Sequence, residues 1–347
     1  MNQQEQKSIE TVLIVNPNSC GGSTGKNWEN LYNQIKEIFG ENPDVAFSQK
    51  SGDGTTLTRD FLRRGFKKIV ALGGDGTINE VANGFFEVIT SGNTISNDKT
   101  APASPILKPI NPDAMIGLIP SGSRNVLAKS LDLPDGIVEC CQRFVNGKPQ
   151  MIDVIAAVIT TAEASATAAN DLPKEVTTRI FLNAAEMGVG AEIIDRSKKI
   201  RDKIKSRFIS TISGVIATLP TYESNLCEVS VDDGRQSLLS KMTMGVVANG
   251  RYLGGGFRAA PRASVTDGLL DITILKNSGS LKMLDEFVDM KVDSDNPEEK
   301  NNIFYMQAKK VSIKSKERDI TVTLDGEPIG ILPATFQVYQ NALSVKL

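Results

Sequence analysis

Uninterrupted hydrophobic runs mark three places in the first 150 residues, and each run ends in Asn, Gly or Pro. They are TVLIVN (11–16), KIVALGG (68–74) and AMIGLIP (114–120). Continuous rather than alternating hydrophobicity is typical of strands that are buried on both faces of a parallel sheet. Between the runs, apolar residues recur at helical spacing, first at Trp28, Leu31, Ile35 and Ile38 and later at Ile78, Val81, Phe85 and Ile89. The pattern predicts an N-terminal doubly wound α/β domain.

The pattern changes after about residue 150, where short strand-like runs follow one another. Several alternate in polarity, which favours a second, mainly antiparallel β-sandwich domain. The runs are IDVIAAVIT, RIFLNAAEMG, CEVSVDD, MTMGVVANG, LLDITILK, KVSIKS, DITVTLDGE and TFQVYQ. We expect one long helix at roughly 190–220, a hairpin loop at 160–175, and a polar insertion at 90–113.

Composition narrows the function classes. The chain has 347 residues, enough for two domains, and a net charge of −2, which gives the whole molecule no electrostatic footprint for nucleic acid. It has no histidine, so a serine–histidine triad and a histidine-ligated metal are excluded. Acid–base chemistry must therefore use carboxylates, lysine or tyrosine.

The cysteines and the chain start point to a cytoplasmic protein. Four cysteines without CxxC spacing fit reduced thiols better than disulfides or a zinc site. MNQQEQKSIE lacks the apolar region of a signal peptide. The most apolar long stretch, 151–169, contains Asp153 and Glu163 and does not fit a bilayer span.

The stretch VALGGDGTINEVANG (70–84) carries the most specific chemistry. Glycines after a buried strand let the backbone approach a ligand closely, and the start of the next helix favours a phosphate. Asp75 would repel a phosphate unless a cation lay between them, so the combination suggests a nucleotide polyphosphate with Mg²⁺. A tight strand–helix turn with Asp75 as the helix cap is the alternative.

Two more strand-end loops strengthen the nucleotide interpretation. NPNSCGGSTGKN (16–27) is close to a P-loop, but Cys20 replaces its first glycine and Asn27 follows the lysine. IPSGSRNVLAKSL (119–131) is a third loop of small residues between strand and helix. The carboxyl ends of parallel strands meet at one edge, so the three loops should converge on one ligand.

These motifs, with DGE (325–327) and ANGRYLGGGFRAAPRASVTDGLLDI (248–272), resemble the lipid-kinase family that includes diacylglycerol and sphingosine kinases. The resemblance covers nearly the whole chain. It implies a nucleotide-binding domain over 1–148, completed by about 331–347, and a β-rich lipid-substrate domain over 149–330. It also implies ATP and Mg²⁺ as cofactors.

The resemblance assigns roles by motif. Asp325 matches the general base for the lipid hydroxyl, with Glu327 beside it, and Asp267 with the carbonyl groups of Ser264 and Leu269 matches a Mg²⁺ site. The implied nucleotide contacts are Asn16, Pro17, Asn18, Ser19, Cys20, Lys26, Ser48, Gly73, Gly74, Asp75, Gly76, Thr77, Ile78, Asn79, Glu80, Ser121, Gly122, Ser123 and Asn125.

Some residues keep alternatives open. Val126 stands where many diacylglycerol kinases have Asp, and Arg124 replaces a small residue, so the lipid is undefined and a catalytically silent member of the family is an alternative. GGDGT is shared with NAD kinases, the nearest rival enzyme. On pattern alone, Asp325-Gly326 reads as an ordinary hairpin turn.

The stretch DRSKKIRDKIKSRF (195–208) is rich in Lys and Arg. A solvated helix face explains such a run, and contact with an anionic membrane explains it equally well. We therefore expect an ATP- and Mg²⁺-dependent lipid kinase of phospholipid metabolism, peripheral at the inner membrane face. Whether it forms a homodimer is left open.

Overall fold

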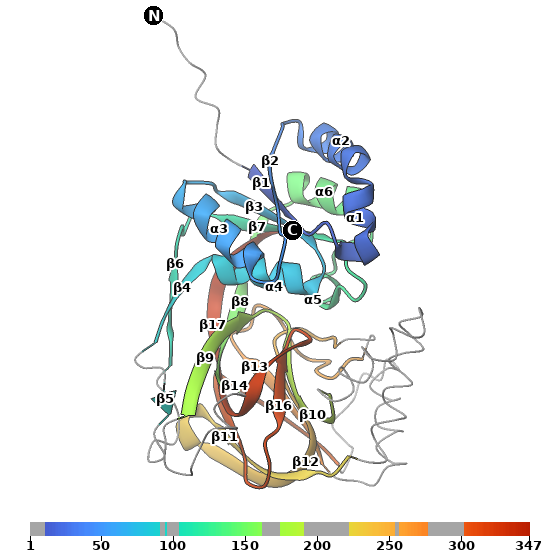
Figure 1. The fold of residues 1–347 in the computed structure, drawn as a ribbon. Coiled ribbons are helices and arrows are strands. Elements are labelled where there is room, and N and C mark those ends of the chain that lie inside the picture. Colours follow the sequence, from blue (N-terminus) through green and yellow to red (C-terminus); the bar gives the residue numbers. More distant parts are fainter. Residues whose placement is uncertain are drawn as a thin grey trace, which may run out of the picture. The chain divides into compact units, whose positions relative to one another are not determined.

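The computed structural model describes residues 11–90, 94–95, 104–161, 174–190, 222–253, 257–276 and 302–347. The chain divides into two compact units (Figure 1). Unit 1 comprises residues 1–88, 107–152 and 343–347, and unit 2 comprises 89–106 and 153–342. The expected helix at 190–220, the basic run at 195–208 and most of the loop at 160–175 lie outside the described residues.

Unit 1 is built on a parallel sheet. Its strands β1 (Thr11–Val15), β2 (Asp44–Phe47), β3 (Lys68–Gly73) and β7 (Met115–Pro120) lie in the order β7-β3-β1-β2. The end of β17 (Glu327–Lys346) adds to β7 in parallel, with Val345 opposite Ile116. The three hydrophobic runs thus form neighbouring strands, as the uninterrupted pattern predicts.

Helices flank this sheet. Helix α2 (Trp28–Phe39) packs against α6 (Ile137–Asn146) over an apolar cluster that includes Leu13, Val70 and Phe144. Helix α3 (Asp53–Arg63) packs against α4 (Asp75–Gly84). Two short helices, α1 (Ser23–Lys26) and α5 (Val126–Ser130), follow strand-end loops. The predicted doubly wound α/β fold is confirmed for this unit.

One predicted helix is too long. The apolar spacing continues to Ile89, but α4 ends at Gly84 and residues 86–89 form strand β4 (Phe86–Ile89). Gly84 is a weak helix former and touches α3 so closely that a Cβ there would lie 2.3 Å from the Cβ of Thr58. Strand β4 pairs with β6 (Ile106–Pro109), which lies in the predicted polar insertion.

Unit 2 is antiparallel, and the predicted β-rich second domain is confirmed. Its hydrogen-bonded strands form a closed ring in the order β12-β10-β16-β17-β15-β11 and back to β12. The ring consists of β10 (Ala184–Gly188), β11 (Asn225–Val231), β12 (Gln236–Ala248), β15 (Lys310–Ser315), β16 (Thr321–Leu324) and part of β17.

Further strands extend this ring at two places. Strands β13 (Leu270–Lys276) and β14 (Ile303–Ala308) continue outward from β12. Strand β8 (Pro149–Thr160) pairs with β17 and β9 (Lys174–Phe181), and β9 with the short β5 (Thr94–Ile95). The predicted single strand RIFLNAAEMG is two strands, β9 and β10, separated at Leu182 and Asn183. That break becomes part of the candidate site.

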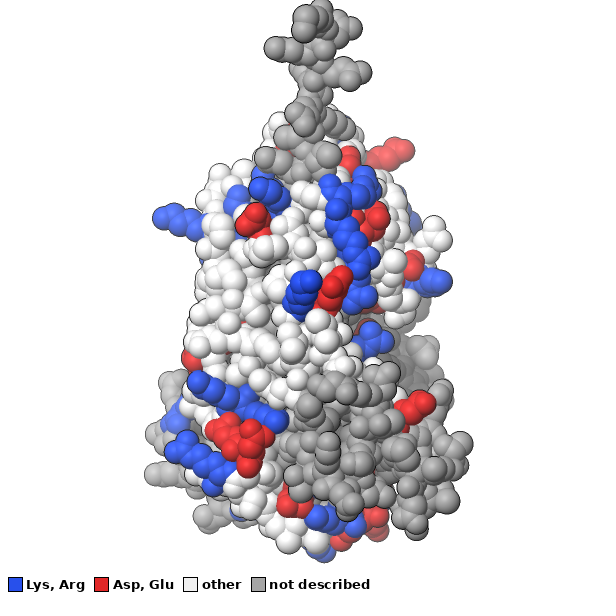
Figure 2. Space-filling view, turned by 90° about the vertical axis from the view of Figure 1, so that its left-hand side faces the viewer, with Lys and Arg blue, Asp and Glu red and all other residues white. Residues whose placement is uncertain are grey.

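Surface charge is mixed on the face that Figure 2 shows. Its described Lys and Arg residues lie among Asp and Glu residues and larger uncharged areas. Some of the exposed basic residues are paired with acidic ones, as in Arg63–Glu87 and Arg64–Asp60. Within the described ranges, no helix is both long enough and apolar enough to cross a membrane.

Candidate functional site

The three strand-end loops of unit 1 are joined by side-chain hydrogen bonds. The first loop (16–27) follows β1, the second (73–77) follows β3, and the third (120–125) follows β7. Asn16 donates its side-chain N–H to the Thr77 hydroxyl at 3.1 Å, and the buried hydroxyls of Ser19 and Ser121 lie 2.8 Å apart. The predicted convergence of the loops is therefore present in the structure.

Glycines let the second and third loops approach each other. A Cβ on Gly122 would lie 2.5 Å from the Cα of Gly74 and 2.7 Å from the side-chain oxygen of Asn125. Such contacts are shorter than real Cβ atoms make, so only glycine fits at Gly122. Gly73 is equally constrained, because a Cβ there would lie 2.4 Å from the Thr77 hydroxyl.

The first loop has left-handed backbone and is stabilised by hydrogen bonds between its own residues. Cys20, Gly21 and Gly22 have φ angles of 52°, 67° and 85°. The Ser19 hydroxyl bonds the Asn16 carbonyl at 2.8 Å and the Thr24 hydroxyl at 2.7 Å. Other predicted contacts in this loop are placed as follows: Asn18 donates its backbone N–H to the Asn16 side chain, Pro17 accepts the N–H of Gly25, and Lys26 is exposed at the end of α1.

Asp75 connects the second loop with the third. Its carboxylate accepts the backbone N–H of Val126, the first residue of α5, at 2.8 Å. Burial raises the pKa of the Asp75 carboxyl, and the charge of Arg124 and the N–H groups of residues 125–127 oppose that rise. Asp75 therefore shapes the third loop in the structure, a contact that sequence reasoning missed.

Glu80 has a comparable role toward the loop after β2. Its carboxylate accepts the N–H groups of Gly52 and Gly54 at 2.9 and 3.0 Å, where α3 begins. Ser48, in the same loop, is buried, and its backbone N–H bonds the Val15 carbonyl. Glu80 thus fixes the start of α3.

The remaining predicted nucleotide contacts differ in exposure. Ile78 is buried in the core, so its side chain does not face a ligand, and Asn79 accepts the side-chain amide of Asn83. Ser123 is exposed, and Asn125 has a φ of 49° and accepts the N–H of Gly122. Gly76 lies in the first turn of α4.

In unit 2, Asp325 occupies a two-residue hairpin turn between β16 and β17. Asp325 and Gly326 have φ angles of 47° and 84°, the left-handed pair that a tight hairpin requires, so the hairpin interpretation is confirmed. The Asp325 carboxylate accepts the N–H groups of Leu182, Asn183 and Ala184 at 3.0–3.2 Å. These residues form the break between β9 and β10. The turn therefore holds the carboxylate in one orientation, and Glu327 is the exposed first residue of β17.

The predicted Mg²⁺ loop contains Ser264, Asp267 and Leu269. The Asp267 carboxylate accepts the N–H of Leu269 at 2.9 Å. Burial raises the pKa of Asp267, and the nearby charge of Asp153 adds to the rise. Burial likewise raises the pKa of Asp271 to about 6, with a further contribution from the charge of Asp267.

Sequence reasoning gave no role to Asp153 and missed Asn249, and both are fully buried in unit 2. The Asp153 carboxylate accepts the N–H groups of Gly268 and Asn341 at 2.7 and 2.8 Å. The Asn249 side chain donates to the carbonyl groups of Leu182 and Asp153 at 2.8 and 3.2 Å. A hydrogen-bonded path therefore runs from the Asp267 loop to the residues that hold Asp325. The motif ANG was the only sequence signal for it.

Two family models match the chain. A diacylglycerol kinase catalytic domain matches residues 10–157, and a YegS C-terminal NAD kinase beta sandwich-like domain matches residues 183–347. Together they span most of the described chain. The fold likeness agrees, since a solved structure of a diacylglycerol kinase from Bacillus anthracis has a TM-score of 0.64 and 21% identity, covering 97% of this chain and 96% of that one.

Curated relatives carry consistent names. A probable lipid kinase, YegS-like, from Enterobacter sp. is 25% identical, covering 97% of this chain and 96% of its own length. A diacylglycerol kinase of Bacillus subtilis is 26% identical, covering 82% of this chain and 79% of its own length. The predicted family and the predicted enzyme class are confirmed: the chain belongs to the diacylglycerol kinase-like family of lipid kinases.

Proposed function

We propose that this protein transfers the γ-phosphoryl group of ATP to a hydroxyl of a lipid alcohol, with Asp325 as the general base. The observation that carries the proposal is the joining of three strand-end loops in unit 1 through Asn16–Thr77, Ser19–Ser121 and Asp75–Val126. Loops at the carboxyl ends of parallel strands are where such sheets bind nucleotides.

The residues of unit 1 fit a nucleotide. Close backbone approach at Gly74 and Gly122 leaves no side chain between the loops, and Lys26 and Arg124 supply positive charge near them. We assign the nucleotide to the residues that the family resemblance implies, with Ile78 contributing only through its backbone. On this proposal, residues 1–148 with 331–347 serve the nucleotide and residues 149–330 serve the lipid.

The residues around Asp267 fit a divalent cation. Burial raises the pKa of Asp267 and of Asp271; the charge of Asp153 adds to the first rise and the charge of Asp267 to the second, so a cation here would relieve part of the cost of ionising both carboxyls. Mg²⁺ binds oxygen ligands and often takes only one or two carboxylates with water. This matters because the described residues contain no group of three His, Cys, Asp or Glu side chains that could hold a metal. A bound cation would neutralise charge and order the loop.

The proposed chemistry depends mainly on positioning. In phosphoryl transfer the protein itself forms few or no covalent bonds with the substrates, so an oriented carboxylate suffices to accept the hydroxyl proton. The N–H groups of residues 182–184 orient Asp325. The Asn249 amide in turn bonds the carbonyl groups of Leu182 and Asp153, which keeps this segment in place. Glu327 supplies a second carboxylate beside the turn.

Two other functions are compatible with specific observations. The model that matches residues 183–347 is described as NAD kinase-like, which favours an NAD kinase as the second candidate. Val126 and Arg124 in the third loop favour a member of the family that binds without turnover. Peripheral membrane association rests on the basic run at 195–208, outside the described residues.

The deciding experiment supplies ATP labelled at the γ-phosphate and a panel of diacylglycerol-like and sphingoid lipid alcohols, with NAD in the same series. We expect label in a lipid only when Mg²⁺ is present. Label in NAD with none in any lipid would establish the second candidate. Nucleotide binding without transfer to any acceptor would establish the silent one.

A further inference from the structure

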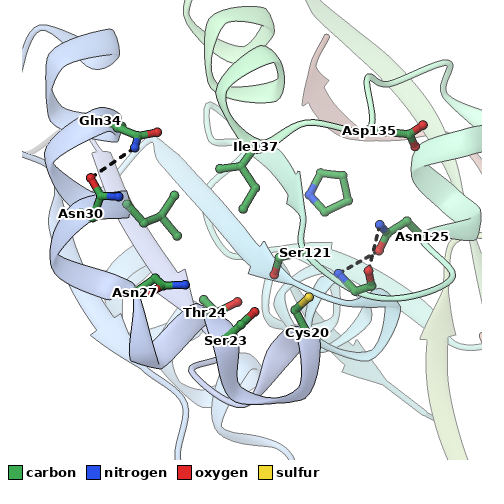
Figure 3. Close-up of a pocket in the computed structure, with 13 residues that line it drawn as sticks. Cys20, Ser23, Thr24, Asn27, Asn30, Gln34, Ser121, Asn125, Asp135 and Ile137 are labelled. Carbon is green, nitrogen blue, oxygen red and sulfur yellow. Dashed lines mark hydrogen bonds between the residues drawn. The ribbon is translucent and has the colours of Figure 1, made fainter. Parts of the chain in front are cut away.

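A cavity of about 480 Å³ lies in unit 1 between the first loop, helix α2, the third loop and the start of α6. We call it the α2–α6 cavity. Figure 3 shows side chains from each of these elements around it, including Cys20, Gln34, Ser121 and Ile137. Its volume is in the range of roughly 300–1,000 Å³ that small-molecule sites occupy. Its loop side includes four of the nucleotide contacts implied by the resemblance, Cys20, Ser121, Gly122 and Asn125, whereas none of those contacts lies on α2 or α6.

The charge of the lining selects against anions. Asp135 is a lining residue, and none of the described lining residues is Lys or Arg. A phosphate or a carboxylate would meet the Asp135 charge without a compensating cation. The cavity therefore suits an uncharged ligand and not a phosphate of the nucleotide.

The polar groups of the lining are mainly amides. Asn27, the residue before α2, and Asn30 and Gln34 of α2 line the cavity, and Gln34 donates to Asn30 at 3.3 Å. A side-chain amide offers two donors and an acceptor with two lone pairs, so this single bond leaves most of their capacity available. Asn and Gln side chains match the donor and acceptor edge of a heterocyclic base.

The apolar part of the lining completes the match. Leu31, Pro120 and Ile137 provide surface on which a flat ring can pack. Asn30 and Gln34 are exposed, so a hydrocarbon ligand that covered them would displace water from their amides without replacing its hydrogen bonds. An ion would lose hydration against the apolar surface. An uncharged ring with polar edges avoids both penalties.

The floor of the cavity is shared with the candidate nucleotide loops. Thr24 and Ser121 line it, and both bond the buried Ser19 hydroxyl, at 2.7 and 2.8 Å. The lining residue Cys20 follows Ser19 in the left-handed part of the first loop. A ligand that reaches this side of the cavity contacts the same network that joins the first loop to the third.

We propose that the α2–α6 cavity binds an uncharged nucleoside or nucleobase, and that its occupant changes the affinity of the loops for ATP. The effect on ATP affinity rests on the proposed function, whereas the binding of a nucleoside does not.

The test measures binding of adenosine, guanosine, cytidine and uridine to the full chain by calorimetry. At least one should bind, and Asn30→Leu and Gln34→Leu should each weaken it about 3- to 10-fold, the effect of one lost hydrogen bond. Asn33→Leu is the matched control, because Asn33 is exposed on the same helix as Asn30 and Gln34 but does not line the cavity. The control should bind as the unchanged chain does.

Two results would overturn the binding site: no nucleoside binds, or Asn30→Leu and Asn33→Leu bind alike. The regulatory half is measured separately, as the affinity for a non-hydrolysable ATP analogue with and without the nucleoside. We expect a change of about 5-fold or more, abolished by Asn30→Leu. An unchanged affinity would overturn that half alone. A failure of phosphoryl transfer to every acceptor would overturn the proposed function and leave the nucleoside measurement intact.

Discussion

Asp75 in unit 1 and Asp325 in unit 2 both belong to an Asp-Gly pair after a strand, and they have different surroundings. Each follows a buried strand and precedes a glycine. Asp75 opens helix α4, is partly buried, and accepts the N–H of Val126 at 2.8 Å, with the N–H groups of Asn125 and Leu127 also directed at it. Asp325 lies in a left-handed hairpin turn and accepts three backbone N–H groups from residues 182–184.

The difference separates two kinds of function for a carboxylate. Burial raises the pKa of Asp75, so its charge has an energetic cost that a nearby cation or N–H group must offset. Asp325 instead has both carboxylate oxygens held by backbone N–H groups from the break between β9 and β10. The surroundings of Asp75 suit a residue that shapes a loop and whose ionisation depends on bound charge. The surroundings of Asp325 suit a base that must face one hydroxyl group.

The largest expected effect comes from Asp325→Asn. An amide cannot accept the hydroxyl proton, and its NH₂ group would face N–H donors at the break between β9 and β10. We expect kcat to fall by about 10²–10⁴-fold, the usual contribution of a general base. Affinity for Mg·ATP, measured by calorimetry, should stay nearly unchanged.

Asp132→Asn serves as the control for that variant. Asp132 is another aspartate in left-handed backbone, with φ 52°, but it is exposed and has no proposed role. It should keep normal kcat. A near-normal kcat in Asp325→Asn would reduce Asp325 to a turn residue and remove the proposed base.

Asp75→Asn should show the reverse pattern. The amide oxygen can still accept the Val126 N–H, but the negative charge is lost, so the loss should fall on Mg·ATP affinity. Hydrogen bonds to charged groups contribute about 1.5–3 kcal/mol, which predicts roughly 10- to 100-fold weaker binding. Equal losses of kcat and of nucleotide affinity in both aspartate variants would remove the distinction between the two residues.

Sequence patterns predicted the local features of both regions. Continuous hydrophobicity identified β1, β3 and β7 to within a residue, because both faces of these strands are buried. The Asp-Gly pair identified the hairpin at 325–326. The assignment of nucleotide, base and metal roles came from the family resemblance and stays a prediction.

Long-range contacts could not be predicted in the same way. The N–H donors to Asp325 lie 141–143 residues earlier in the chain, and the donor to Asp75 lies 51 residues later. Nothing in a local pattern specifies such pairs. The end of α4 at Gly84 was missed for the same reason, because its close packing on Thr58 is tertiary.

Gly122→Ala tests whether stability and nucleotide binding in unit 1 depend on the close contact between the second and third loops. The added Cβ would meet Gly74 at 2.5 Å, so the second and third loops must separate or shift. Overpacking of this kind typically costs about 1–3 kcal/mol. We expect a lower free energy of unfolding by denaturant titration and weaker Mg·ATP binding. Gly74→Ala is the milder control, since its Cβ would lie 3.3 Å from Gly122. Equal stability of both variants would contradict the close approach.

The smallest expected effect is a pH-dependent change in thermal stability at Asp271, a buried carboxylate of unit 2 whose pKa is raised by burial as that of Asp75 is. Burial, together with the Asp267 charge, raises its pKa from 3.8 to about 6, although the Gln307 amide donates to both oxygens and the Arg262 charge opposes the rise. Between about pH 4 and pH 6 the folded chain therefore binds more protons at this site than the unfolded chain. Its contribution to stability falls as pH rises through that window, and the cost remains above pH 6.

Asp271→Asn keeps the acceptor for Gln307 and removes the charge. With a chelator present, the variant should unfold at about the same temperature as the unchanged chain near pH 4 and at a higher temperature above pH 6. Each kcal/mol gained should raise the Tm by about 2–4 °C if unit 2 unfolds as one body of its size. Added Mg²⁺ should narrow the gap at high pH, because a cation at Asp267 removes part of the repulsion that makes ionised Asp271 costly. Melting curves that stay parallel from pH 4 to pH 8 would show that Asp271 titrates normally. The repulsion between Asp267 and Asp271 would then be too small for a cation to relieve measurably.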